Sequence, residues 1–155
     1  MPYDKIRDLL NQYEFVNVAT SDFSGKPNLA PKLLLKCDGN VIFLIDYVIG
    51  RTFENLKANP RVSLSIMDSE SLTGYQLNGN VEIIESGKEH ERILKELHKK
   101  QIALSSKRVV EGLYRGKTHQ NFEATMPDKV IVFKIKITEI VEIATSGQLK
   151  RENFE

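Results

Sequence analysis

The stretch GKPNLAPKLLLKCDGNVIFLIDYVIGRTFENLKANPRVSLSIM, residues 25–67, contains the pattern that decides the fold. One apolar run ends at the turn-forming Asp38-Gly39-Asn40 and a second begins at once, as in a β-hairpin. A basic turn, Gly50-Arg51-Thr52, then opens a short helix that ends at Asn59-Pro60. The stretch therefore predicts two hairpin strands, a helix and a further strand, at residues 27–36, 41–45, 50–58 and 62–67.

The segments on either side extend this pattern. Residues 2–13 carry apolar side chains at helical spacing, and residues 15–20 are typical of a strand that ends in a turn. Alternation predicts another strand over residues 75–83, within which Gly79 indicates a bulge or the close approach of another backbone. The capping-box spacing of residues 86–89 begins a helix that we expect to run to about Leu104.

The last third of the chain is less regular until its final strand. Residues 105–128 predict an irregular segment that a short helix at 108–114 would shorten. Residues 130–138 alternate strictly, and a phase slip at 139–141 indicates a bulge. We expect one domain over residues 1–145 and a solvated tail over 146–155. Hairpin-linked strands with few helices favour a mainly β, antiparallel Greek-key barrel with three peripheral helices over an alternating βαβ sheet.

Composition narrows the class of protein. The 155 residues include 22 basic and 21 acidic side chains, a formal net charge of +1, which argues against general nucleic-acid binding. The single cysteine, Cys37, excludes an intrachain disulfide. No signal-peptide pattern and no apolar run of membrane-spanning length are present, so we expect a cytoplasmic location and no membrane association.

The motif search leaves one candidate site. The sequence has no glycine-rich nucleotide loop, no nucleophile elbow and no histidine spacing typical of a metal site. Gly50-Arg51-Thr52 is different, because the first turn of a helix offers unpaired N–H donors and Arg51 adds a planar charged donor. This combination suits a phosphate group. Pro31, within the second strand, indicates an edge or a break in pairing that would leave backbone groups free for a ligand.

Residues 15–85 resemble the flavin-binding split barrel of the pyridoxamine 5′-phosphate oxidase-like superfamily. The resemblance rests on the order of hairpin, basic turn, short helix and the Asn59-Pro60-Arg61-Val62-Ser63-Leu64 run. It implies a split β-barrel homodimer that binds FMN near the subunit interface, with the ring beside strand 30–36 and the phosphate at Arg51, Thr52 and Lys36. The cofactor-binding residues that it implies are Pro31, Lys32, Leu33, Lys36, Ile45, Asp46, Arg51 and Thr52.

Departures from the family pattern shape the expected function. The C-terminal Trp-Arg-Leu pattern of the true oxidases is absent, so the chain is more similar to small flavin-binding and general-stress-type members. We expect flavin chemistry on a small molecule or with a redox partner, without a dedicated acid–base residue. The alternatives are a non-catalytic flavin or electron carrier, a barrel that uses F420 or haem, and a barrel without a cofactor. Lys32 is either a cation beside the flavin ring or an outward-facing strand lysine.

Overall fold

The computed structural model describes residues 2–114 and 129–154. Its elements in chain order are α1 (Pro2–Leu10), β1 (Phe15–Ser21), β2 (Pro27–Asp38), β3 (Val41–Asp46), α2 (Arg51–Ala58), β4 (Arg61–Asp68), β5 (Thr73–Ile84), α3 (Lys88–Tyr114), β6 (Ile131–Ile143) and β7 (Leu149–Asn153).

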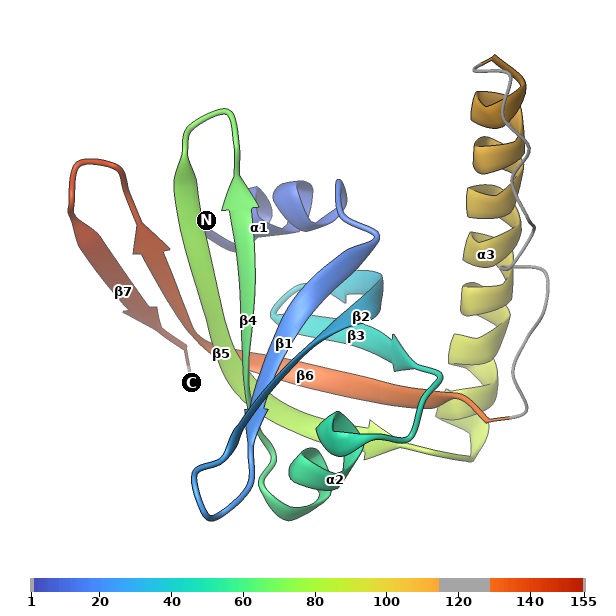
Figure 1. The fold of residues 1–155 in the computed structure, drawn as a ribbon, viewed down its shortest axis with the longest axis horizontal. Coiled ribbons are helices and arrows are strands. Elements are labelled where there is room, and N and C mark those ends of the chain that lie inside the picture. Colours follow the sequence, from blue (N-terminus) through green and yellow to red (C-terminus); the bar gives the residue numbers. More distant parts are fainter. Residues whose placement is uncertain (1, 115–128, 155) are drawn as a thin grey trace.

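The strands form one antiparallel barrel (Figure 1). Their order is β3-β2-β1-β4-β5-β6, and pairing of β3 with β6 closes the ring of six strands. The seventh strand, β7, pairs only with the far end of β6. The prediction of a mainly β antiparallel barrel with three helices is confirmed, because hairpins join most neighbouring strands along the chain.

The barrel interior is filled by alternate side chains of the six strands β1–β6. Val18, Leu44, Leu64 and Phe133 are at most 1% exposed, and α1 closes one end of the barrel with Ile6, Leu9 and Leu10. Burying a side chain of this size stabilises the fold by roughly 1.5–3 kcal/mol. This interior cluster fixes which face of each strand points outward.

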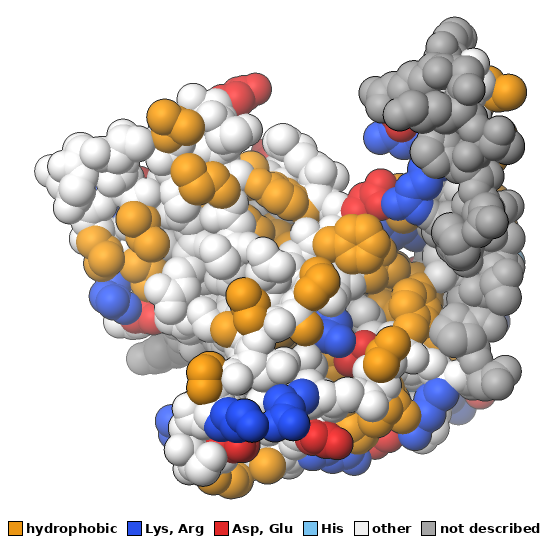
Figure 2. Space-filling view, in the orientation of Figure 1, with side chains coloured by type: hydrophobic (Ala, Val, Ile, Leu, Met, Phe, Trp, Pro, Cys, Tyr) orange, Lys and Arg blue, Asp and Glu red, His pale blue; other side chains and the backbone are white. Residues whose placement is uncertain are grey.

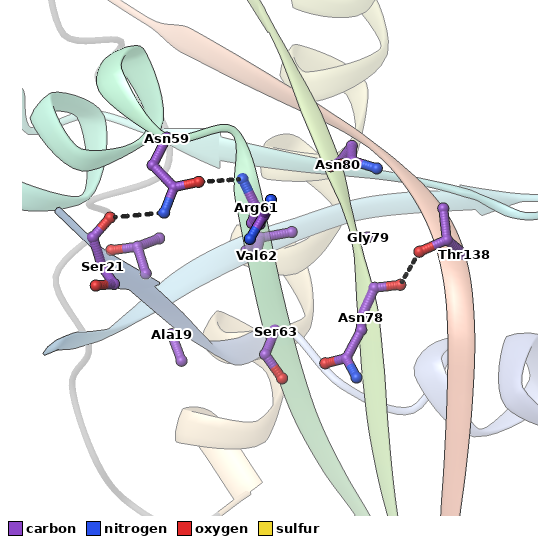
Figure 3. Close-up of a pocket in the computed structure, with 11 residues that line it drawn as sticks. Ala19, Ser21, Asn59, Arg61, Val62, Ser63, Asn78, Gly79, Asn80 and Thr138 are labelled. Carbon is purple, nitrogen blue, oxygen red and sulfur yellow. Dashed lines mark hydrogen bonds between the residues drawn. The ribbon is translucent and has the colours of Figure 1, made fainter. Parts of the chain in front are cut away.

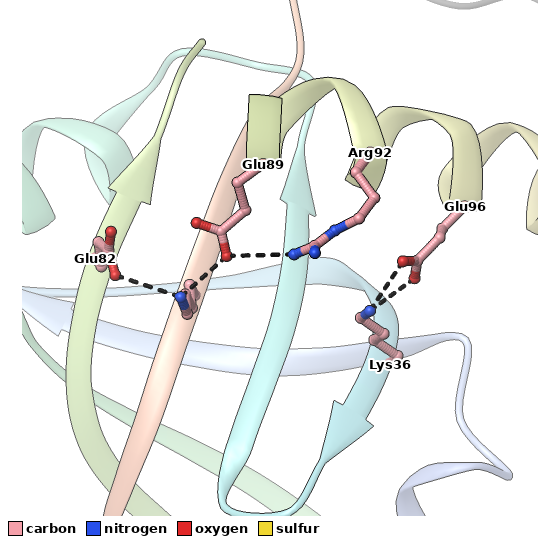
Figure 4. Close-up of polar contacts among 6 residues, drawn as sticks. Lys36, Glu82, Glu89, Arg92 and Glu96 are labelled. Carbon is pink, nitrogen blue, oxygen red and sulfur yellow. Dashed lines mark hydrogen bonds and ion pairs between the residues drawn. The ribbon is translucent and has the colours of Figure 1, made fainter. Parts of the chain in front are cut away.

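Helix α3 packs against the outside of the barrel. Its Ile93 and Leu97 cover an outer apolar cluster completed by Leu33, Leu35, Phe43, Ile45, Ile84, Val130 and Val132. Ion pairs lie beside this cluster: Lys134 is 3.0 Å from Glu89, and Figure 4 shows Glu89 also facing Arg92. Among the described helices, none has the length and apolar composition needed to cross a bilayer.

The predicted end of this helix at Leu104 is wrong, because α3 continues without a break to Tyr114. No proline or glycine interrupts residues 102–111, so nothing in the sequence stops the helix there. The ion pair of Arg108 with Glu14 ties its second half to the segment before β1. The remainder of the predicted irregular segment, residues 115–128, lies outside the described residues.

Two register shifts shape the sheet. Asn78 pairs with Glu139 and Gly79 with Ile137, so β6 bulges at Thr138. Of the two expectations for Gly79, the close approach of another backbone is confirmed, since a Cβ there would stand 2.4 Å from the Lys136 carbonyl oxygen. The extra residue itself is Thr138 of β6, just before the phase slip at residues 139–141. A second shift lies in β2, where Leu34 pairs with Leu44 and Lys36 with Phe43, which leaves Leu35 without a partner.

The C-terminal segment, which we expect to be a solvated tail, contains a strand. Gly147, with a φ of +76°, allows a tight turn that returns the chain as β7 along β6. All five residues of β7 are exposed, so this strand is solvated. Beyond the strand, the ring centres of Phe154 and Tyr3 lie 4.3 Å apart. The backbone N–H of Phe154 donates to the Thr138 carbonyl.

Candidate functional site

The barrel splits where β2 leaves β3. Pairing of the two strands begins at Leu33 with Ile45, whereas residues 27–32 of β2 pair with β1 alone. Pro31 therefore lies on a strand edge, which is one of the positions that the sequence predicted for this proline. This edge leaves backbone groups of β2 available to a ligand.

Helix α2 begins close to this edge. Its N-cap residue, Gly50, has extended backbone angles and no side chain caps the first turn. The first helical hydrogen bond runs from the Glu54 N–H to the Gly50 carbonyl, so the N–H groups of residues 51–53 have no partner within the helix. Arg51 is exposed and makes no ion pair within residues 2–114 and 129–154. Together these groups form a donor set that fits an anion.

The buried face of α2 fixes the position of these donors. The Asn28 amide donates to the Thr52 hydroxyl oxygen at 3.1 Å, and the Asn55 amide donates to Thr20 at the same distance. Thr52 is only 2% exposed. Because its oxygen accepts from Asn28, the Thr52 hydroxyl hydrogen remains free to donate elsewhere.

Lys32 and Asp46 come together inside the barrel. The Lys32 Nζ lies 2.8 Å from the Asp46 Oδ1, and the side chains are 11% and 3% exposed. Lys32 is thus not an outward-facing strand lysine, because its register with Val16 turns it inward, where its charge is paired with Asp46.

Lys36 lies on the other side of the β2 bulge and points toward α3. Figure 4 shows its ammonium group held by both carboxylate oxygens of Glu96, at 2.8 and 3.0 Å. The same Nζ lies 5.0 Å from the centre of the Phe43 ring. Leu33 and Ile45 are buried in the cluster beneath α3, so only their backbone could meet a ligand. The structure therefore brings Lys32 to Asp46, whereas Lys36 is directed toward α3.

Lys100 of α3 contacts the backbone of the same bulge from outside the barrel. Its ammonium group donates to the carbonyl oxygens of Leu34 and Leu35, at the register shift between β2 and β3. Burial lowers the pKa of Lys100, and the nearby Glu14 carboxylate opposes this shift. The bulge is therefore a fixed feature that α3 holds in place.

The sequence analysis missed a hollow of about 570 Å³ on the outer face of the barrel (Figure 3). Arg61 and Asn80 are exposed at this hollow, and Asn59, beside them, donates to the Ser21 carbonyl. Its remaining lining comes from β1, β4, β5 and β6: Ala19, Thr20, Ser21, Val62, Ser63, Asn78, Gly79 and Thr138. The sequence pattern that could have indicated this hollow is the run of polar residues at alternate positions of β4 and β5. The same pattern is typical of any sheet face that is exposed to solvent, so it did not single out a site.

A family model described as pyridoxamine 5′-phosphate oxidase matches residues 3–144. The chain belongs to the pyridoxamine 5′-phosphate oxidase family. No curated protein sequence matches it.

Solved structures share the fold of this family member. A Clostridium acetobutylicum protein related to general stress protein 26 is 17% identical, with a TM-score of 0.64 over 98% of this chain and 94% of that one. An FMN-binding protein related to the oxidase, from Nostoc punctiforme PCC 73102, is 14% identical, with a TM-score of 0.60 over 100% and 97%. A haem-binding protein from Mycobacterium smegmatis is 15% identical, with a TM-score of 0.65 over 99% of this chain and 58% of its own. At these identities the likeness is one of fold.

Proposed function

We propose that this family member binds FMN and that the bound flavin carries out redox chemistry with a small molecule. The observation that carries the proposal is the uncapped first turn of α2 with the exposed Arg51, placed beside the free edge of β2. A phosphate monoester needs several N–H donors and a positive charge, and this turn supplies both. The fold shared with an FMN-binding protein from Nostoc punctiforme supports the choice of cofactor.

The proposal gives each site residue a part. Arg51 and the N–H groups of residues 51–53 hold the phosphate, and the Thr52 hydroxyl donates to it. The backbone of Pro31 and Lys32 lines the ring at the unpaired edge of β2. The flavin supplies the hydride or electron chemistry, while the protein binds and orients it. Lys36 stays with Glu96 and takes no part in phosphate binding.

A homodimer is the second part of the proposal. Among the described helices, α2 contacts β1 and β5. Figure 1 shows no helix lying over the outer face of β4 and the strands beside it, and separate apolar side chains lie exposed there (Figure 2). Those on or beside this face are Phe15, Leu29, Met67, Leu72 and Ile143. Polar hollows between them suit an interface that also holds a ligand. Light scattering after size exclusion, with and without FMN, tests for a dimer.

The direct test is a flavin titration of purified protein. Removal of Arg51 by Arg51→Ala should weaken FMN binding by about 1.5–3 kcal/mol, the usual worth of a charge-assisted hydrogen bond, or about 10- to 150-fold in Kd. Arg92→Ala is the matched control, because Arg92 is an exposed arginine whose contact with Glu89 is 3.9 Å long. Equal Kd values for the two variants would remove Arg51 from the site.

Spectra and turnover separate the remaining functions. The absorption spectrum of freshly purified protein distinguishes flavin from F420 and from haem, which the Mycobacterium smegmatis relative binds. Steady-state oxidation of NAD(P)H by the FMN-loaded protein distinguishes an enzyme from an electron carrier. Protein that is colourless and takes up no added FMN would contradict the proposal.

A further inference from the structure

Lys32 and Asp46 form their ion pair where β2 and β3 part. The last residue pair of the two strands is Leu33 with Ile45, and the next residue of each strand carries one of the two charges. The ion pair thus bridges the start of the split, at an N–O distance of 2.8 Å. Both side chains are almost fully buried.

Stability alone does not explain a buried pair of charges at this place. Burying two charges carries a desolvation cost that apolar residues of similar volume avoid, so such pairs are often neutral for stability. Here the pair is also incompletely satisfied, because the Asp46 Oδ2 is buried without a hydrogen-bond partner. An unsatisfied carboxylate oxygen adds to the cost. A role beyond stability is therefore favoured.

The second contact of Asp46 indicates that role. Its Oδ1 also accepts a hydrogen bond from the Val48 N–H at 3.1 Å. Asp46 thereby holds the turn at residues 47–50, which leads directly into Arg51. A second anchor comes from α3, where the Gln101 amide contacts the Tyr47 hydroxyl. The side chains of Val48 and Ile49, next to these anchors, remain exposed.

We infer that Lys32 and Asp46 are positioning residues that set the turn at 47–50 and, through it, the phosphate donors at the start of α2. This inference rests on the proposed function. The Asp46 carboxylate accepts the hydrogen bond of the Val48 N–H, and Lys32 neutralises its negative charge. The carboxylate can therefore lie close to an anion site without repelling the phosphate. Neither residue touches the phosphate.

The test replaces the pair by apolar residues in Lys32→Met/Asp46→Leu. Loss of the acceptor should speed hydrogen exchange of the Val48 amide at least tenfold. The Kd for FMN should rise at least tenfold, while the Kd for riboflavin, which lacks the phosphate, should change less than threefold. Asp46→Asn keeps an oxygen for the Val48 N–H, so exchange of the Val48 amide should stay within about threefold of the wild type.

Controls keep the outcomes separate. Glu85→Gln removes the ion pair of Lys57 with Glu85 at the other end of α2 and should alter neither Val48 exchange nor flavin binding. If leucine prevents folding, Lys32→Met/Asp46→Ala takes its place without overfilling the site. Equal losses for FMN and riboflavin, or unchanged Val48 exchange in the folded double variant, would overturn the inference. Wild-type protein that binds neither flavin would instead refute the proposed function, and Val48 exchange would still decide whether the pair holds the turn.

Discussion

Gly79 lies where β5 and β6 leave no room for a side chain, and its replacement by alanine tests the described barrel. A Cβ atom at this position would stand 2.4 Å from the Lys136 carbonyl oxygen and 3.1 Å from the Ile135 Cγ2. Contacts between non-bonded heavy atoms are favourable only near 3.5–4.0 Å. Because the first obstacle is backbone, Gly79→Ala would force β5 and β6 apart by about 1 Å.

Two effects of Gly79→Ala lower the free energy of unfolding, and a third partly offsets them. Overpacking that moves the backbone costs about 1–3 kcal/mol, and each ladder hydrogen bond that is lost beside the bulge costs about 1 kcal/mol. The lower backbone entropy of unfolded alanine returns roughly 0.5–1 kcal/mol. With one such hydrogen bond lost, we expect Gly79→Ala to lower the free energy of unfolding by about 2 kcal/mol, which corresponds to roughly 4–8 °C in Tm for a domain of this size.

Chemical denaturation of the purified variants measures this loss, and Gly74→Ala in the same strand is the control. A Cβ atom at Gly74 would lie 3.8 Å from the Ile143 Cβ, an ordinary contact. Its free energy of unfolding should change by less than about 1 kcal/mol. If Gly79→Ala is as stable as Gly74→Ala, then the close approach of β5 and β6 is not real, and the bulge at Thr138 is misplaced.

Three further perturbations test other parts of the structure. Burial raises the pKa of the Tyr3 hydroxyl from 10.0 to about 12, and the nearby Cys37 and Glu152 add to this rise. Because the folded state binds the Tyr3 proton more tightly than the unfolded state, the stability that Tyr3 contributes below pH 10 should be lost between about pH 10 and about pH 12. Denaturation curves of Tyr3→Phe should lack this loss. Phe133→Ala empties a fully buried site and should lower the free energy of unfolding by about 3–5 kcal/mol, whereas a loss below about 1 kcal/mol would place Phe133 outside the core. Lys36→Met breaks the half-exposed pair with Glu96 and should lower the free energy of unfolding by no more than about 1 kcal/mol; its Kd for FMN should stay within about twofold, and a tenfold rise would return Lys36 to the phosphate site.

Local sequence patterns predicted the parts of the fold that depend on neighbours in the chain. The hairpin at Asp38-Gly39-Asn40, the short helix before Asn59-Pro60 and the close backbone approach at Gly79 all follow from turn chemistry and alternation. The end of α3 and strand β7 were missed for different reasons. The second half of α3 is tied to a distant segment by Arg108 with Glu14. Strand β7 is a local hairpin partner of β6, but its residues LKREN show no apolar alternation that would indicate a strand.

The candidate site could be predicted only in part because it depends on which face of a strand each residue occupies. In β2, Lys32 and Leu34 point inward, and strict alternation would place Lys36 on the same face. The extra residue at Leu35 reverses that phase, so Lys36 pairs with the outward-facing Phe43 and reaches Glu96. Nothing in Leu33-Leu34-Leu35 reveals the bulge, since all three residues are apolar and buried on one face or the other. A single unpaired residue thus directs one basic side chain to α3 and leaves Arg51, on a helix that begins after the split, as the cation that the proposed phosphate site depends on.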